Sequence, residues 1–187
     1  MAGRLTPGEM IVATMIGTMR RSYAVEHGVK DAHRFNGDGY QIDIEGARAE
    51  MITAKLLNLY WSGALHLSKP KNALCGDVGN IEVRLAMFDF KLHAGDEIDK
   101  QMVKRCHLLL HETDKQKGPL PFVLVVGCNG HYVLAGWIDG IAGTDARWFG
   151  DPFDTKRPAY WVPIPNLNPM PELLSMIKAQ TRANPKL

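Results

Sequence analysis

The chain has 187 residues, of which 45% are hydrophobic and 22% charged, so it is long enough to form one domain with a substantial core. This composition excludes an intrinsically disordered chain, which has fewer apolar residues and a larger net charge. Lysine and arginine outnumber aspartate and glutamate by only 22 to 20, so charge alone does not indicate a nucleic-acid-binding protein.

The three cysteines, Cys75, Cys106 and Cys128, are an odd number without a closely spaced pair. This usage favours a reducing compartment over a disulfide framework or a cysteine-rich zinc site. The apolar stretch near the N-terminus contains Glu9 and is followed by two arginines, unlike a secretory signal. No apolar run reaches the roughly 18 residues of a membrane-spanning helix. We therefore predict a cytoplasmic protein without a membrane partner.

The first predicted helix covers residues 7–27. Thr6 can cap it, and Glu9 stands three residues later, as in a capping box. Pro7 suits the first helical position, and Gly28 is a natural stop signal. The stretch that follows is polar and rich in turn-forming residues.

A second helix is predicted from Asp43 to Trp61, because apolar residues recur there every three or four positions. Glu50 falls on or beside the apolar face of this helix. An unpaired buried carboxylate is costly or takes up a proton, so Glu50 needs a cation or a hydrogen-bonded partner. The predicted core stripe consists of Ala47, Glu50 or Met51, Ala54, Leu57 and Trp61.

The sequence then changes to strand patterns. Residues 73–77 and 81–88 are predicted strands separated by a turn at 78–80, and Glu82 and Arg84 share one face of the second strand. Asn129-Gly130 is a strong hairpin turn. Further strands are predicted at residues 107–111, 121–127, 132–138 and 160–162, with helices around 99–105 and 171–180.

No internal repeat, low-complexity tract or Gly/Ser linker divides the chain, so we predict a single domain. It comprises an N-terminal helix and loop (1–40), a core (41–165), and a C-terminal tail and helix (166–187). Two helices, a mostly antiparallel series of strands and a last helix predict an α/β (α+β) fold. In this fold a mixed central sheet is flanked by helices.

The strongest candidate site consists of Glu50, Asp77, Glu82 and Arg84. Two carboxylates beside a tight turn can approach closely, and like charges at that distance require a metal ion or a proton between them. Mg²⁺ binds one or two carboxylates together with waters and substrate phosphates. A metal ion there would activate water and neutralise charge on a phosphodiester.

These residues give the chain a resemblance to the PD-(D/E)XK nuclease superfamily, in particular to its small bacterial or phage-encoded members. Residues 46–50, continued by Ala54 and Leu57, resemble the glutamate-bearing helix of that superfamily. Residues 76–84 resemble its aspartate followed by Glu-x-Lys. The runs 121–126, 132–140 and 160–163 are similar to the strands that complete its core, so the resemblance covers residues 40–165.

The resemblance implies a restriction-endonuclease-like core and metal-dependent cleavage of DNA. It implies that Glu50, Asp77 and Glu82 bind Mg²⁺ or Mn²⁺, joined by the backbone carbonyl of Val83. Asp77, Glu82 and Arg84 would be the catalytic residues. Arg84 departs from the pattern, which has a lysine there to orient the attacking water or stabilise the transition state. Arginine supplies positive charge, but with a pKa above about 12 it cannot accept a proton.

Several basic residues are candidates for contacts with a phosphate backbone: Lys69, Lys71, Lys156 and Arg157. The alternative interpretation is that they are solvated surface charges.

The acidic site also has an alternative, in which Glu82 and Arg84 form a surface ion pair on one face, Asp77 is a turn residue and Glu50 extends its carboxylate to solvent. A further alternative is a catalytically inactive nuclease-fold protein that binds nucleic acid or protein, in which Arg84, Glu82 and Asp77 form an ion cluster that needs no metal. A homodimer or a protein partner stays open. His107 and His111 have the spacing of zinc ligands on a helix, but their segment is predicted to be a strand without a third ligand.

Overall fold

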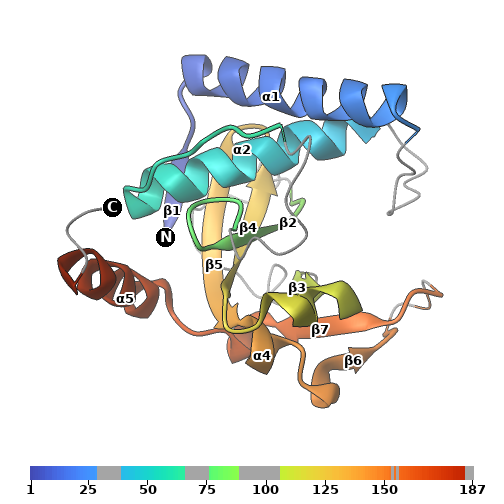
Figure 1. Cartoon of the computed structure of the whole chain (residues 1–187), viewed down its shortest axis with the longest axis vertical. Coiled ribbons are helices and arrows are strands. Elements are labelled where there is room, and N and C mark those ends of the chain that lie inside the picture. The colour runs from blue at the N-terminus through green and yellow to red at the C-terminus, as the bar shows by residue number, and fades with distance from the viewer. Residues whose placement is uncertain (29–38, 66–75, 89–105, 153, 155, 184–187) are drawn as a thin grey trace.

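The computed structural model describes residues 1–28, 39–65, 76–88, 106–152, 154 and 156–183 (Figure 1). The first residues of the strand predicted at 73–77, the helix predicted around 99–105, Lys69 and Lys71 lie outside this part of the chain. No helix in the described ranges is long and apolar enough to cross a membrane.

Helix α1 (Pro7–Glu26) is capped as the sequence predicts. The Thr6 hydroxyl accepts a hydrogen bond from the backbone N–H of Glu9 at 3.3 Å. The Glu9 carboxylate accepts one from the backbone N–H of Thr6 at 2.6 Å, which completes the capping box. Gly28 follows the last turn with φ of 62°, in the left-handed region that ends helices. The predicted helix is confirmed.

Helix α2 (Gly39–Leu57) is shifted toward the N-terminus relative to the prediction. It begins before Asp43, because residues 40–42 contain no glycine or proline to interrupt it. It ends before Asn58, which adopts a left-handed conformation with φ of 54°. Trp61 therefore lies beyond the helix, and the prediction that it ends the core stripe is wrong.

The central sheet is mixed, as predicted. Its strand order is β1-β5-β4-β2, with the β2–β4 pair parallel and the other two pairs antiparallel. Asn129 and Gly130 form the hairpin between β4 and β5 with φ of 53° and 86°, which confirms the predicted turn. The strands are β1 (Ala2–Arg4), β2 (Glu82–Ala86), β4 (Pro121–Cys128) and β5 (His131–Asp139).

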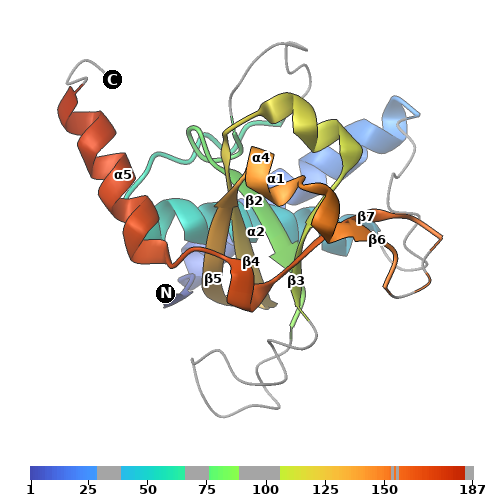
Figure 2. The same ribbon diagram turned by 90° about the horizontal axis from the view of Figure 1, so that it is seen from below.

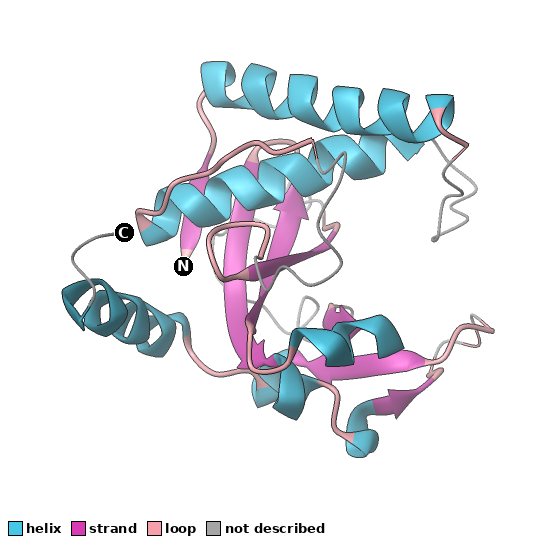
Figure 3. Ribbon diagram, in the orientation of Figure 1, coloured by secondary structure: helices cyan, strands magenta, loops and turns pink. Residues whose placement is uncertain are grey.

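Strand β4 is buried on both faces, which explains its nearly continuous apolar sequence. Val123 and Val125 pack in one core cluster with residues of α2 such as Ile52. Phe122 and Leu124 pack in a second cluster, against the other sheet. The central sheet thus has α2 on one face and a second sheet on the other (Figure 3).

The second sheet is antiparallel with the order β3-β7-β6. It consists of β3 (His107–Leu110), β7 (Ala159–Pro163) and β6 (Phe149–Gly150). The strands predicted at 107–111 and 160–162 are therefore real, but they form this separate sheet and do not extend the central one.

The remaining elements lie around the two sheets. Helix α1 packs on the outer side of α2, and α5 (Met170–Ala183) contributes Leu173 to the same core cluster as α2 (Figures 1 and 2). The short helix α4 (Gly140–Gly143) follows β5. A 3₁₀ helix, η2 (Glu112–Lys117), lies between β3 and β4 in the chain, and its Lys117 contacts Glu82 of β2.

Candidate functional site

A tight turn places Asp77 beside the start of β2. Val78 and Ile81 form an antiparallel bridge across this turn. A Cβ atom at Gly76 would lie 2.2 Å from the carbonyl oxygen of Ile81, so only glycine fits this approach. Asp77 lies in the bend before the bridge, so the prediction that it ends a strand is wrong. Its Oδ2 accepts a hydrogen bond from the backbone N–H of Val83 at 3.0 Å, which fixes the carboxylate at the edge of β2.

Glu82 is the centre of a buried charge cluster. Its Oε2 lies 2.6 Å from the Lys117 ammonium and 3.2 Å from Nη1 of Arg84. Arg84 also lies 4.0 Å from Oδ2 of Asp77. Asp114 joins the cluster from η2, 2.8 Å from Arg84 and 3.3 Å from Lys117. Three carboxylates and two cations therefore meet, with a formal charge of −1.

The two cations of this cluster also lie over the same aromatic ring. Arg84 is 5.2 Å and Lys117 5.7 Å from the centre of the Phe122 ring. Cation–π attraction thus adds to the ion pairs in holding both cations in position. The alternative interpretation, a surface ion pair of Glu82 and Arg84, holds for the pairing but not for the exposure, because Glu82 is buried.

Asp114 is held by hydrogen bonds to both its oxygens. Oδ2 accepts from the backbone N–H of His111 at 2.9 Å, and Oδ1 accepts from Arg84. Burial alone would raise the pKa of the Asp114 carboxyl. The positive charge of Arg84, the hydrogen bond from His111 and the charge of Lys117 outweigh it, so the pKa lies below the ordinary value of 3.8.

The lowered pKa makes the contribution of Asp114 to stability pH-dependent. A carboxyl with a lowered folded-state pKa stabilises the fold fully above 3.8 and loses this contribution as the pH falls through the folded-state value. We expect Asp114→Asn to lower the free energy of unfolding by about 1.5–3 kcal/mol at pH 7, the range of hydrogen bonds to charged groups. The deficit should shrink as the pH falls below 3.8 toward the folded-state pKa. Urea unfolding between pH 7 and pH 3 measures it.

A matched control is Glu26→Gln, which neutralises an exposed carboxylate at the end of α1. It should leave the free energy of unfolding nearly unchanged across the same pH range. A deficit for Asp114→Asn that is the same at pH 3 and pH 7 would contradict an electrostatic role for Asp114.

Glu50 lies on α2 but is engaged by α1. Its two oxygens accept hydrogen bonds from Nη1 and Nη2 of Arg20 at 2.6 and 2.8 Å, and Oε2 also accepts one from the Trp61 indole at 3.0 Å. This supplies the cation that a buried carboxylate on the apolar face requires. The sequence predicted the need for a partner but not that Arg20 is this partner.

Asp77 is close enough to Glu50 for their charges to interact. Burial raises the pKa of Glu50 most, Arg20 opposes that rise, and the negative charge of Asp77 adds to it. The hydrogen bonds of Glu50, however, come from Arg20 and Trp61 and not from the residues around Glu82. Glu50 is part of an ion pair with Arg20, so it can bind a metal ion only when Arg20 releases it.

The chemistry of the donor atoms around Glu82 fits a hard divalent ion. Among the described residues, Oε1 of Glu82 is buried and has no hydrogen-bond partner. Oxygen atoms of Asp77 and the carbonyl of Val83, which accepts from Arg84 at 3.2 Å, lie on the same turn and strand. Within the described ranges, no three His, Cys, Asp or Glu side chains lie in an arrangement that could hold a metal ion.

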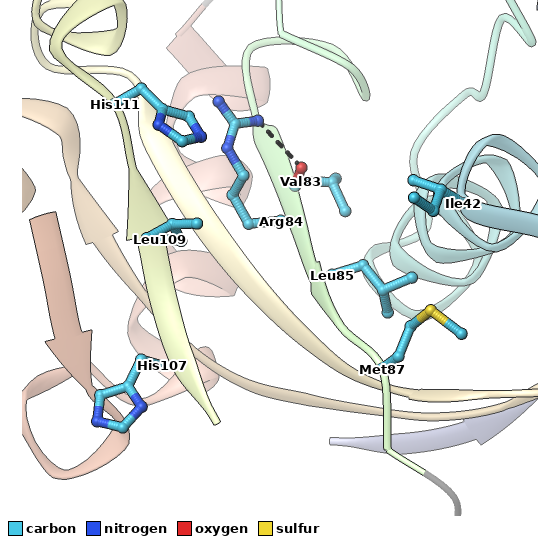
Figure 4. A pocket seen from close by; sticks show the side chains of 9 residues that line it. Ile42, Val83, Arg84, Leu85, Met87, His107, Leu109 and His111 are labelled. Carbon is cyan, nitrogen blue, oxygen red and sulfur yellow. Dashed lines mark hydrogen bonds between the residues drawn. The ribbon is translucent and has the colours of Figure 1, made fainter. Parts of the chain in front are cut away.

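A pocket of about 620 Å³ opens beside Arg84, between α2, β2 and β3. Figure 4 shows Arg84 near His111 at one end and His107 at the other, with Leu85 and Leu109 along the walls. This volume lies within the roughly 300–1,000 Å³ of small-molecule sites. The pocket gives a ligand of moderate size access to the end at which Arg84 lies. His107 is on a strand, so the helical zinc spacing does not apply.

The other predicted phosphate contacts lie elsewhere. Lys156 and Arg157 are exposed in the connection from β6 to β7, where the Arg157 backbone N–H donates to Asp151 at 3.2 Å. In Figures 1 and 2 this connection projects away from the turn that carries Asp77. Lys69 and Lys71 are outside the described residues.

Sequence reasoning missed three residues of the site: Arg20, Asp114 and Lys117. Arg20 and Lys117 belong to pairs of basic residues that are usually solvated, and Asp114 stands in an ordinary polar segment. The one available signal was the buried position of Glu50, which demanded a cation without identifying it. Comparisons of the chain with models of protein families, with curated proteins and with solved structures give no match.

Proposed function

We propose that the protein is a metal-dependent nuclease of the PD-(D/E)XK type that hydrolyses phosphodiester bonds of DNA in the cytoplasm. The observation that carries this proposal is the cluster around Glu82, in which three carboxylates and two cations meet beside a pocket. Its charge of −1 would become positive with a divalent ion, and a positive site attracts a phosphodiester.

The oxygen donors define where the ion would bind. Asp77, Glu82 and the Val83 carbonyl would hold Mg²⁺ or Mn²⁺, with Glu50 as a further ligand after release from Arg20. A bound ion lowers the pKa of water and neutralises charge on a phosphate.

The protein's own cations would act on the substrate. In hydrolysis the oxygen of water forms a bond to phosphorus while the bond to the leaving sugar oxygen breaks. The water loses one proton to solvent and the leaving oxygen gains one, and negative charge grows on the phosphate in between. Arg84 donates hydrogen bonds to phosphate oxygens but cannot accept a proton. Lys117, whose ammonium reaches Glu82, would orient water or donate to the leaving oxygen. Asp114 positions both cations.

The direct test is cleavage of plasmid and of single-stranded DNA by the purified protein with Mg²⁺ or Mn²⁺ and with EDTA. Metal-dependent cleavage that EDTA stops is the expected result. RNA is tested in parallel. If the protein cleaves RNA and not DNA, RNA is the substrate.

A second candidate function is binding without catalysis, on a nuclease-like scaffold. The observation that favours it is that Arg20, Arg84 and Lys117 already form ion pairs with the acids. Such a cluster needs no metal, and the protein would then act as a nucleic-acid- or protein-binding factor.

Thermal melting with and without divalent ions separates the two candidates. A ligand that binds only the folded state stabilises it by about 1.4 kcal/mol at ten times its Kd. For a chain of this size we expect the melting temperature to rise by about 3–5 °C in Mn²⁺ or Mg²⁺. Asp77→Asn should remove this shift. An unchanged melting temperature in wild-type protein at saturating ion concentrations would favour the second candidate.

A further inference from the structure

The outer face of α1 is apolar, although it faces solvent. Five of the twelve large hydrophobic side chains exposed among the described residues belong to this helix: Ile11, Val12, Met15, Met19 and Val25. Ile11 is 61% and Met15 58% exposed. The opposite face of α1 packs on α2 through buried Ala13 and Gly17. A helix that is apolar on both faces normally has protein on both faces.

The exposed residues follow the spacing of a helix–helix contact. We call Gly8, Ile11, Val12, Met15, Met19 and Ser22 the α1 stripe; all six are exposed. The positions 8, 12, 15, 19 and 22 alternate steps of four and three, which is the spacing of the a and d positions of a coiled coil. None of the six is charged, so the stripe meets an identical stripe without like-charge repulsion.

We propose that the α1 stripe binds the α1 stripe of a second copy of this chain, with the two helices antiparallel about a two-fold axis at Met15. Apart from Val12, which lies level with Thr18, the stripe is symmetric about this residue. In an antiparallel pair centred there, Met15 meets Met15, Ile11 lies level with Met19, and Gly8 lies level with Ser22. Large side chains thus meet in the middle and small ones at both ends, which allows close packing.

The size of the stripe sets the strength of this dimer. Fifteen helical residues form a face about 22 Å long and about 10 Å wide. The area of this face is well below the roughly 800 Å² that each partner buries in a standard stable interface. The dimer is therefore weak and forms in proportion to protein concentration.

A membrane surface fits the same helix less well. Helices that lie on membranes carry lysine and arginine on a polar face that stays in water. In α1 the face opposite the stripe is covered by α2, and Arg20 is paired with buried Glu50. This inference does not depend on the proposed nuclease activity.

Disulfide trapping at Met15 tests the geometry. In a background with Cys75 and Cys128 replaced by serine, Met15→Cys should form a covalent dimer rapidly under mild oxidation, because the two sulfurs face each other at the axis. The control is Ile141→Cys, at an equally accessible position that is 65% exposed on α4. Trapping at Met15 no faster than at Ile141 would overturn the proposal.

Sedimentation over about a hundredfold range of concentration supplies an independent readout, because a weak dimer follows mass action. The wild-type mass should rise with concentration, and Met15→Asp should stay monomeric while Ile141→Asp behaves as wild type. A concentration-independent monomer in wild type overturns the proposal. So does binding to anionic phosphatidylserine vesicles that Met15→Asp abolishes, which would assign the stripe to a membrane surface.

Discussion

Asp77→Asn is expected to abolish metal-dependent DNA cleavage and to leave the fold intact. The asparagine side chain keeps an oxygen for the Val83 N–H that Asp77 now binds at 3.0 Å, but it removes a negative charge that a divalent ion needs. Loss of several kcal/mol of metal-dependent charge stabilisation lowers the rate at least about 100-fold, since each 1.36 kcal/mol is a factor of ten. Initial cleavage rates at saturating Mg²⁺ or Mn²⁺ measure this.

Glu112→Gln is the matched control for this substitution. Glu112 lies on neighbouring η2, but its side chain is 59% exposed and pairs with Lys115. Its neutralisation should change the cleavage rate less than about twofold, because exposed ion pairs contribute little. Full activity of Asp77→Asn would remove Asp77 from the site. If wild-type protein cuts no nucleic acid, the enzymatic proposal is wrong. Binding of nucleic acid or protein without catalysis, the second candidate function, would then remain.

The largest loss of stability is expected from Glu45→Ala. Glu45 is fully buried beneath the β4–β5 hairpin, where it accepts hydrogen bonds from the Tyr132 hydroxyl and from Arg48. Arg48 also donates to the Thr14 hydroxyl of α1 at 2.9 Å, so this network joins both helices to the sheet. Removal of one partner from a buried ion pair costs about 3–5 kcal/mol, because the other charge stays buried without compensation.

Urea unfolding at pH 7 measures this effect, and two companion variants separate its causes. Tyr132→Phe removes only the hydroxyl and should cost about 1.5–3 kcal/mol, the range of one hydrogen bond to a charged group. Glu45→Leu combined with Arg48→Met should recover part of the loss, because no unpaired charge is left behind. A loss below about 1 kcal/mol for Glu45→Ala would show that the network does not carry stability.

Burial explains why Tyr132 itself is expected to stay protonated. Loss of solvent around its ring, and then the hydrogen bond to Glu45, raise the pKa of the Tyr132 hydroxyl well above its ordinary value. The hydroxyl therefore still donates its hydrogen bond to Glu45 at pH 10, where an ordinary tyrosine is half ionised.

Features whose signals act over a few residues could be predicted from the sequence. Thr6 and Glu9 fix the start of α1, because a capping box joins groups only three positions apart. Asn129-Gly130 fixes the hairpin, because these residues tolerate positive φ. The apolar run 121–126 identified a buried strand. The mixed α/β fold class followed from the order of such local patterns.

Which charged side chains form pairs depends on how elements that are distant in the sequence pack together. Glu50 binds Arg20 thirty positions away, and Glu82 binds Lys117 thirty-five positions away. Nothing local chooses among the 22 basic residues, because the partner of a buried acid is whichever cation the packing of other elements brings within reach. The three-residue strand β1 was equally hidden, since its pairing depends on β5, far along the chain. Local chemistry thus set the elements, and packing between them set the site.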